Sequence, residues 1–164
     1  MKEILTTLYH YNYWANRRLL DRLAGLNAGQ FTAIAPAFGQ VSLRSILVHI
    51  LMAEWIWRTR CQEGLSPTTM LDEADFPDPT LLIERYQVEE EKMRTYLASL
   101  SDSDLEQTIH YHTTSGQPMA NKLAHILHHL VLHGMQHRAE VAAILTDQGH
   151  SPGDIDFIIY LRQQ

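Results

Sequence analysis

The chain has 164 residues, an apolar fraction of 45% and a formal charge of −6. This length suits a domain with a hydrophobic core, and this composition excludes a largely disordered chain. The acidic balance disfavours direct binding to nucleic acid, because a negative surface repels phosphate backbones. No window approaches ~18 uninterrupted apolar residues, so we expect no helix that spans a membrane.

A single cysteine, Cys61, cannot form an internal disulfide, and this fits a reducing compartment. Residues 1–14 contain charges and asparagine within their apolar stretch, which is unlike a signal peptide. We therefore expect a cytoplasmic protein in which residues 1–164 form one domain.

Helical periodicity predicts a first helix over residues 2–26, followed by a connection over residues 31–40 that contains proline and glycine. Ser42 is a suitable N-cap for a second helix over residues 43–62, which should end before Gly64.

A polar loop with several prolines, residues 66–79, leads to a third helix over residues 80–100, for which Asp78 and Pro79 supply a cap and a first turn. The third helix has an apolar line at helical spacing. These features predict a long connection between the second and third helices.

Residues 108–113 are β-prone, and Ser115-Gly116 can turn the chain back, so we expect an irregular excursion or a short hairpin there. A fourth helix is predicted over residues 119–147 and a short last helix over residues 154–162. Four long helices with one long crossover loop predict an all-α four-helix bundle.

Four of the ten histidines recur at four-residue intervals on the fourth helix: His125, His129, His133 and His137. Because four residues advance ~400° around an α-helix, the row drifts ~40° per step relative to the apolar stripe. His137 falls within the stripe and His133 at its margin, whereas the other two lie progressively outside it. We expect His133 and His137 to point toward the interior of the bundle.

Two histidines at positions i and i+4 can bind one metal ion, and a third ligand must come from another helix. His49 is the best candidate, since it lies within the apolar run 46–53 of a helix that we expect to be buried almost all round. Buried imidazoles cost free energy unless their nitrogens are paired, and an ion pairs all three. The sequence predicts that His49, His133 and His137 bind a divalent ion such as zinc, nickel, iron or manganese.

Other interpretations stay open for this set. The three histidines could be core residues bonded to carbonyls or carboxylates. Glu140 is three residues after His137 and is a candidate fourth ligand, hydrogen-bond acceptor or general base, or a rim carboxylate. Glu54 lies within the apolar second helix, where we expect an interior partner such as Arg17, with a catalytic role as the alternative. His110, His112, His125 and His128 are expected to be solvated. The aromatic residues of the first two helices are interpreted as core or interface residues: Tyr13, Trp14, Trp55 and Trp57.

Four segments together resemble the DinB-like family of bacterial metalloproteins, namely residues 11–20, 43–57, 126–138 and 148–161. The resemblance implies an up-up-down-down four-helix bundle, frequent homodimers, and a divalent metal held by three histidines that match His49, His133 and His137. One departure is Ala139-Glu140, where the family usually has Gly-Gln. Relatives include transferases and isomerases that use low-molecular-weight thiols such as bacillithiol and mycothiol.

Three protein ligands leave an open coordination position, as in catalytic metal sites. We expect a metal-dependent enzyme that acts on a small molecule, either a thiol S-transferase or a hydrolase. A non-catalytic metal-binding stress-response protein is the second possibility, and a structural homodimer whose histidines need no metal is the third.

Overall fold

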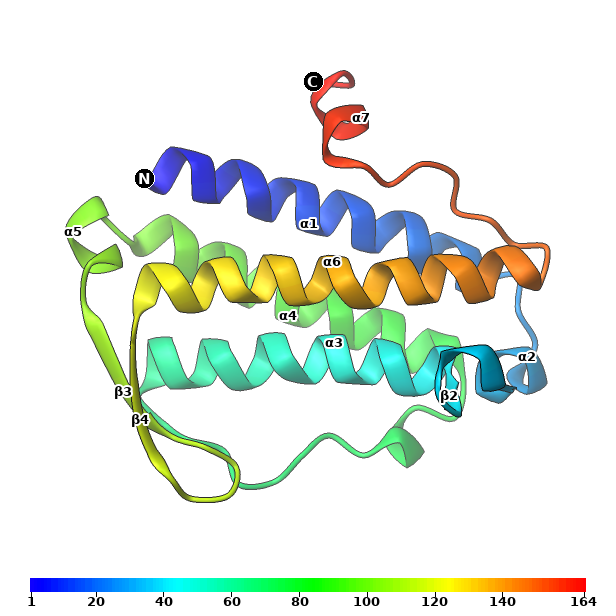
Figure 1. The fold of residues 1–164 in the computed structure, drawn as a ribbon, viewed down its shortest axis with the longest axis horizontal. Helices are drawn as coiled ribbons and strands as arrows, with labels where there is room; N and C mark the ends of the chain where they lie inside the picture. The colour runs from blue at the N-terminus through cyan, green and yellow to red at the C-terminus, as the bar shows by residue number, and fades with distance from the viewer.

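A computed structural model describes residues 1–164. Four long helices lie side by side in it (Figure 1): α1 (Lys2–Leu23), α3 (Leu43–Arg58), α4 (Pro79–Ser99) and α6 (Leu123–Asp147). The predicted four-helix bundle is confirmed. None of the helices combines the length and the hydropathy needed to cross a lipid bilayer.

The helix directions differ from those that the resemblance implies. In Figure 1, α1 and α6 run one way and α3 and α4 run the other, so the order along the chain is up-down-down-up. The short connection after α1 reverses the chain. The loop over residues 64–78 then returns along the length of the bundle, and α4 therefore starts at the same end as α3.

Several short elements lie in the predicted connections. The connection between α1 and α3 contains α2 (Ala28–Thr32), β1 (Ile34–Ala35), η1 (Pro36–Phe38) and β2 (Val41–Ser42). Asn27 caps α2, and its side chain accepts a hydrogen bond from the Gln30 amide at 2.9 Å. Ser42 caps α3 as predicted, since its hydroxyl accepts from the Ser45 amide at 3.0 Å. Further short elements are η3 (Glu73–Asp75), α5 (Asp102–Leu105) and α7 (Phe157–Leu161).

A short hairpin precedes α6. Strand β3 (Thr108–His112) pairs antiparallel with β4 (Pro118–Lys122), which confirms the hairpin alternative. The predicted start of the fourth helix at residue 119 was wrong, because the backbone of residues 118–122 pairs with β3 instead of forming the first helical turn. At its C-terminal end, α3 continues into a π-helical turn, η2 (Thr59–Glu63). Gly64 ends this turn with a left-handed φ of 68°.

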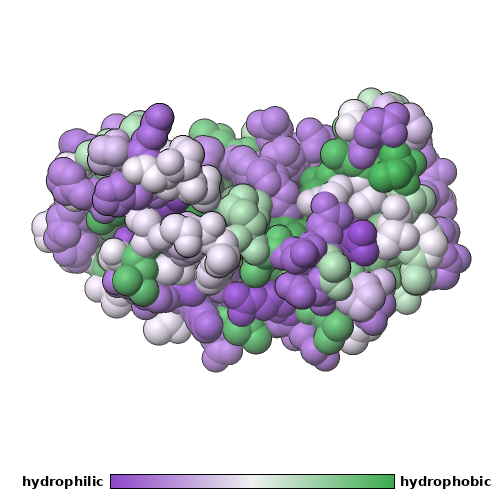
Figure 2. Space-filling view, turned by 90° about the horizontal axis from the view of Figure 1, so that it is seen from below, coloured by the Kyte–Doolittle hydropathy of each residue, from purple (hydrophilic) through white to green (hydrophobic).

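Apolar side chains from all four helices fill the bundle. The largest of those that are almost fully buried are Tyr9, Tyr13, Leu19, Leu23, Phe31, Leu43, Leu47, Leu51, Leu82, Met93 and Leu105. On the face seen in Figure 2, hydrophobic residues form separate patches among hydrophilic ones. This distribution matches the amphipathic helices that the periodicity predicts.

A buried arginine joins α6 to α1. The Arg138 side chain has no exposed surface, and its Nη1 donates to Oδ1 of Asn12 and, at 3.1 Å, to Oδ1 of Asn16. Gly134 provides the room, since a Cβ at this position would lie 2.7 Å from Arg138 Nη1 and 3.1 Å from Asn12 Oδ1. A larger residue would therefore displace the guanidinium.

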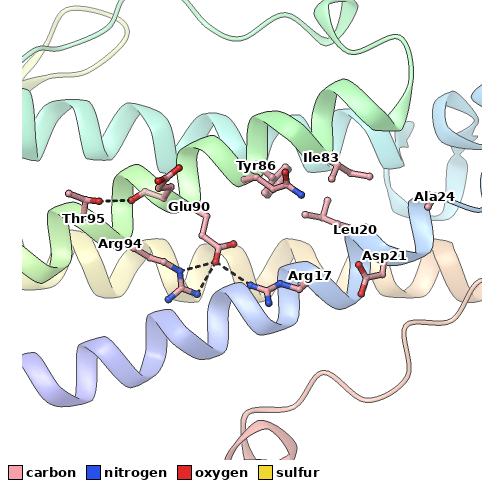
Figure 3. Close-up of a pocket in the computed structure, with 11 residues that line it drawn as sticks. Arg17, Leu20, Asp21, Ala24, Ile83, Tyr86, Glu90, Arg94 and Thr95 are labelled. Carbon is pink, nitrogen blue, oxygen red and sulfur yellow. Dashed lines mark hydrogen bonds and ion pairs between the residues drawn. The ribbon is translucent and has the colours of Figure 1, made fainter.

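The predicted pairing of Glu54 with Arg17 was wrong. Glu54 is buried and accepts a hydrogen bond from the Tyr13 hydroxyl at 2.8 Å. Arg17 lies in a surface groove between α1 and α4 (Figure 3), where Arg17 Nη2 and Arg94 Nε contact Oε1 of Glu90 at 3.4 and 2.8 Å. The surface carboxylate satisfies both cations without the desolvation that an interior pair requires.

Burial raises the pKa of Glu54 to about 7, and the negative charges of Glu89 and Glu90 act in the same direction. The hydrogen bond from Tyr13 opposes this shift. The folded protein therefore holds the proton of Glu54 at pH values where an unfolded chain releases it.

We predict that Glu54→Gln removes a loss of stability that the native protein shows as the pH rises from about 4.5 to about 7. Over this range unfolding releases the Glu54 proton, so the free energy of unfolding should fall by on the order of 3 kcal/mol. Glutamine cannot ionise but can still accept from Tyr13. Urea unfolding at pH 5 and pH 8 checks this, with the exposed Glu84→Gln as control. An equal pH dependence in both variants would contradict the prediction.

Candidate metal centre

Three histidines from two helices meet on the seam between α3 and α6. His49 comes from α3, and His133 and His137 come from successive turns of α6. One ring nitrogen of each lies within 4.8 Å of those of the other two, and the Nε2 atoms of His49 and His133 are 3.0 Å apart. The three pairs of ring centroids are 4.6–4.8 Å apart. The structure thus brings together the three histidines that the sequence singles out.

The expectation that these histidines are buried was wrong. His133 and His137 are half-buried, and His49 is exposed although its neighbours Val48 and Ile50 are buried. A helix on the outside of a bundle keeps one side toward solvent, and a single polar residue in an apolar run can occupy that side. The cluster is therefore open to small molecules from solution.

The electrostatics favour neutral rings. Burial lowers the pKa of His133 to about 4, and the nearby His137 and His49 add to this shift. Burial also lowers the pKa of His49, with a second contribution from His137. Since a metal ion binds the neutral imidazole, these two rings need lose no proton to bind one at neutral pH.

Glu140 contacts one of the three rings. Its Oε2 lies 2.8 Å from Nδ1 of His137, one turn earlier on the same helix. When the carboxylate accepts the Nδ1 proton, it fixes the tautomer and leaves Nε2 of His137 free to bind an ion. Among the roles considered for Glu140, the geometry supports that of hydrogen-bond acceptor.

The donor set fits a divalent ion. Nitrogens bound at 2.0–2.1 Å in a tetrahedral site are ~3.3 Å apart, so the 3.0 Å separation of His49 and His133 needs only a small opening. No carbonyl or carboxylate of the chain accepts from either ring, and the only hydrogen-bonding contact of each is with the other. This differs from the core-histidine alternative, in which each ring would have its own backbone or side-chain partner.

The other histidines of α6 lie outside this cluster. His125 and His129 are exposed, although the His129 ring centroid is 5.5 Å from that of His133. His128, expected to be solvated, is half-buried, and its Nδ1 donates to the Ala124 carbonyl at 2.6 Å. His110 and His112 are exposed on β3, as expected.

A wide groove of the molecule lies elsewhere. It has a volume of about 670 Å³ and runs between α1 and α4 (Figure 3). Its walls include Arg17, Asp21, Glu90, Glu91 and Arg94, and no histidine lines it. The three-histidine cluster, rather than this groove, therefore has the residues suited to metal chemistry.

Comparison with known proteins identifies the family of the chain. The profile of the DinB family matches residues 1–164. The chain belongs to the DinB family. It is 26% identical to Protein DinB of Bacillus subtilis (strain 168) over 172 residues, which cover 98% of this chain and 95% of that protein. The solved structure of YfiT from Bacillus subtilis superposes with a TM-score of 0.68 at 16% identity, covering 92% of this chain and 91% of YfiT. YfiT is described as a probable metal-dependent hydrolase with an unusual four-helix bundle topology.

We predict that chelation destabilises the zinc-loaded protein. An ion that binds only the folded state adds about 4 kcal/mol when its free concentration is 1,000 times Kd. Removal with EDTA should therefore lower Tm by on the order of 10 °C. His137→Ala should abolish this response, and the exposed His125→Ala on the same helix should retain it. Differential scanning calorimetry measures both, and an unchanged Tm after verified zinc removal would rule out a folding role.

We further predict that Glu140 tunes the affinity for metal. Glu140→Gln keeps an acceptor for His137 but loses the charge, so the zinc Kd should rise about tenfold. Glu140→Ala should raise it by up to about 100-fold, the range typical of partners that orient a ligand. Competition with a chromogenic chelator gives the Kd, and Asp147→Asn on the same helix is the control. Equal Kd values for the native protein and Glu140→Ala would mark Glu140 as a rim residue.

Proposed function

We propose that this chain is a divalent-metal-dependent enzyme that acts on a small molecule, with His49, His133 and His137 as the metal ligands. The observation that best supports the proposal is the 3.0 Å approach of His49 Nε2 to His133 Nε2 beside His137, in a cluster open to solvent. The description of YfiT as a probable metal-dependent hydrolase supports a metal-dependent activity in this fold.

Each residue of the site has a distinct task in this proposal. Three neutral imidazoles bind the ion, and Glu140 holds the His137 ring in the orientation that presents Nε2. Because only three ligands would come from the protein, a bound ion would keep a position for a substrate, and the exposure of His49 leaves the cluster open to one. An ion held there supplies Lewis acidity, which lowers the pKa of a coordinated thiol or water.

The first candidate reaction within this class is transfer to a low-molecular-weight thiol. Burial raises the pKa of the chain's only thiol, Cys61, to about 12, so the reactive thiol would come from solution. Glu140 is engaged with His137 and is not free to accept a proton from a substrate. A free thiol has a pKa of about 8.5 and needs a much smaller shift than water to ionise at neutral pH. The lower pKa of a thiol therefore supports a thiol as the nucleophile.

Hydrolysis is the second candidate, and the description of YfiT is the observation that favours it. In that reaction an ion held by the three histidines would supply Lewis acidity to a water molecule, and no base from the chain would be required. We also propose that the metal is zinc, nickel or iron, because imidazole ligands suit these ions. The family resemblance supports a homodimer, and the lone Cys61 supports a location in the cytoplasm.

We predict that zinc- or nickel-loaded protein conjugates bacillithiol or mycothiol to monochlorobimane faster than the uncatalysed reaction. His133→Ala should lower this rate by more than about 100-fold, since loss of a ligand should exceed the effect of losing a partner that orients one. The exposed His10→Ala on α1 should keep the rate. Bimane fluorescence measures conjugation. Release of nitrophenol from p-nitrophenyl acetate without any thiol would instead favour the hydrolase, and no activity above that of His133→Ala in either assay would leave a non-catalytic metal-binding protein.

A further inference from the structure

A smaller pocket lies on the same seam as the three histidines. It has a volume of about 250 Å³ and is lined by Trp57, Tyr111, Asn121, His125, Ile126 and His129. These residues come from α3, from the hairpin and from α6, which meet where α3 ends and α6 begins (Figure 1). Trp57, interpreted from the sequence as a core or interface residue, is one wall of this pocket.

A row of rings connects the pocket to the candidate metal centre. The centroids of His133 and His129 are 5.5 Å apart, those of His129 and Trp57 are 6.1 Å apart, and those of Trp57 and Tyr111 are 4.8 Å apart. His129 is therefore both a wall of the pocket and a neighbour of a proposed metal ligand. A molecule bound in the pocket can reach the open side of the three-histidine cluster.

Contacts with Arg60 and Asn121 hold the walls of the pocket in place. The Arg60 guanidinium lies 4.7 Å from the Trp57 ring centroid and 4.9 Å from that of Tyr111, and its Nη2 donates to the His112 carbonyl at 2.9 Å. The Tyr111 hydroxyl donates to Asn121 Oδ1 at 2.8 Å, which leaves the Asn121 amide nitrogen as a donor at the rim. The rings are thus ordered without a ligand, and ordering them costs little when a ligand binds.

We propose that this pocket binds an aromatic ring of the substrate that is acted on at the metal centre, and this rests on the proposed function. Edge-to-face packing against Trp57 and Tyr111 favours an aromatic guest. The volume is below the ~300–1,000 Å³ of pockets that enclose a whole ligand, so it suits one ring while the reactive group extends to the histidines.

The charges around the pocket select among aromatic groups. No carboxylate lines it, and the Arg60 cation already lies against both aromatic walls. A cationic guest would be repelled by Arg60 and by an ion at the histidines, whereas a neutral or anionic one would not. The substrate class is therefore a neutral or anionic aryl compound, and an aryl ammonium compound is excluded.

The test compares two hydroxamates, which chelate the same ion but differ in their side groups. Isothermal titration of zinc-loaded protein should show benzohydroxamate binding tighter than acetohydroxamate by about tenfold or more, since ring packing and burial are together worth about 1.4 kcal/mol. Trp57→Leu should abolish this preference and leave the acetohydroxamate Kd unchanged. Trp55→Leu, on the same helix but outside the pocket, should keep it. Should Trp57→Leu fail to fold, Tyr111→Val on the hairpin makes the same test.

A second experiment uses metal-free protein, so that binding in the pocket is measured without an ion at the candidate metal centre. Saturation-transfer NMR should detect the ring of phenylacetate but not that of phenethylammonium, and Tyr111→Val should lose the effect. Phenylacetate binding without hydroxamate binding would support the pocket and overturn the proposed metal function. A hydroxamate preference that is equal in native protein, Trp57→Leu and Tyr111→Val would overturn the pocket and leave the metal function standing. Equal binding of both aryl ions would overturn the charge selection.

Discussion

The buried guanidinium of Arg138 is the constraint on which the candidate metal centre depends, because it fixes how α6 is rotated in the bundle. It donates to two asparagines of α1, and its Nε and Nη2 have no partner in the chain. His133 directly precedes Gly134, which makes room for the guanidinium, and His137 directly precedes Arg138. Since neighbouring residues are about 100° apart on a helix, the contact with α1 turns both histidines toward the seam with α3. The guanidinium lies 5.6 Å from the Tyr11 ring centroid and interacts with the charge of Glu54, but no carboxylate is bonded to it. Its burial is therefore costly, and the site depends on a packing arrangement that is not optimal for stability.

Periodicity could predict the four long helices and the paired histidines, because both are properties of a single helix face. It could not predict how deeply a side chain is buried. An apolar stripe tells which side of a helix faces its neighbours, but His49 lies at the solvent-exposed edge of such a side. The start of α6 was placed too early because residues 118–122 are compatible with either a helix or a strand. Their partner, β3, decides between the two. The pairing of Glu54 with Tyr13 was likewise missed, since it joins two helices and no local pattern specifies it.

The aromatic pocket could not be predicted from the sequence either. Trp57 lies at a helical spacing typical of a core residue, and nothing in its neighbours along the chain distinguishes a buried wall from an open one. The distinction arises from the hairpin, which places the Tyr111 ring centroid 4.8 Å from that of Trp57. The hairpin does not fill the space beside these rings, and a pocket of about 250 Å³ remains. The hairpin lies between α5 and α6, so changes in it can alter the walls of the pocket without altering the helices that carry the three histidines.

The residue at which this chain departs from the usual pattern of its family lies in contact with a proposed ligand. Glu140 stands where the resemblance leads one to expect glutamine, and it is bonded to His137 Nδ1. A carboxylate acceptor makes the imidazole a more basic ligand than an amide acceptor does. It also lowers the charge of the occupied site, because a divalent ion with three neutral imidazoles and one nearby carboxylate has a net charge of +1 rather than +2. In the proposed enzyme, a site with this single positive charge would attract an anionic thiol or aryl compound but hold it less tightly, and weaker binding would leave a nucleophile more reactive and let product leave. The substitution therefore alters the reactivity expected of the site while leaving its three ligands in place.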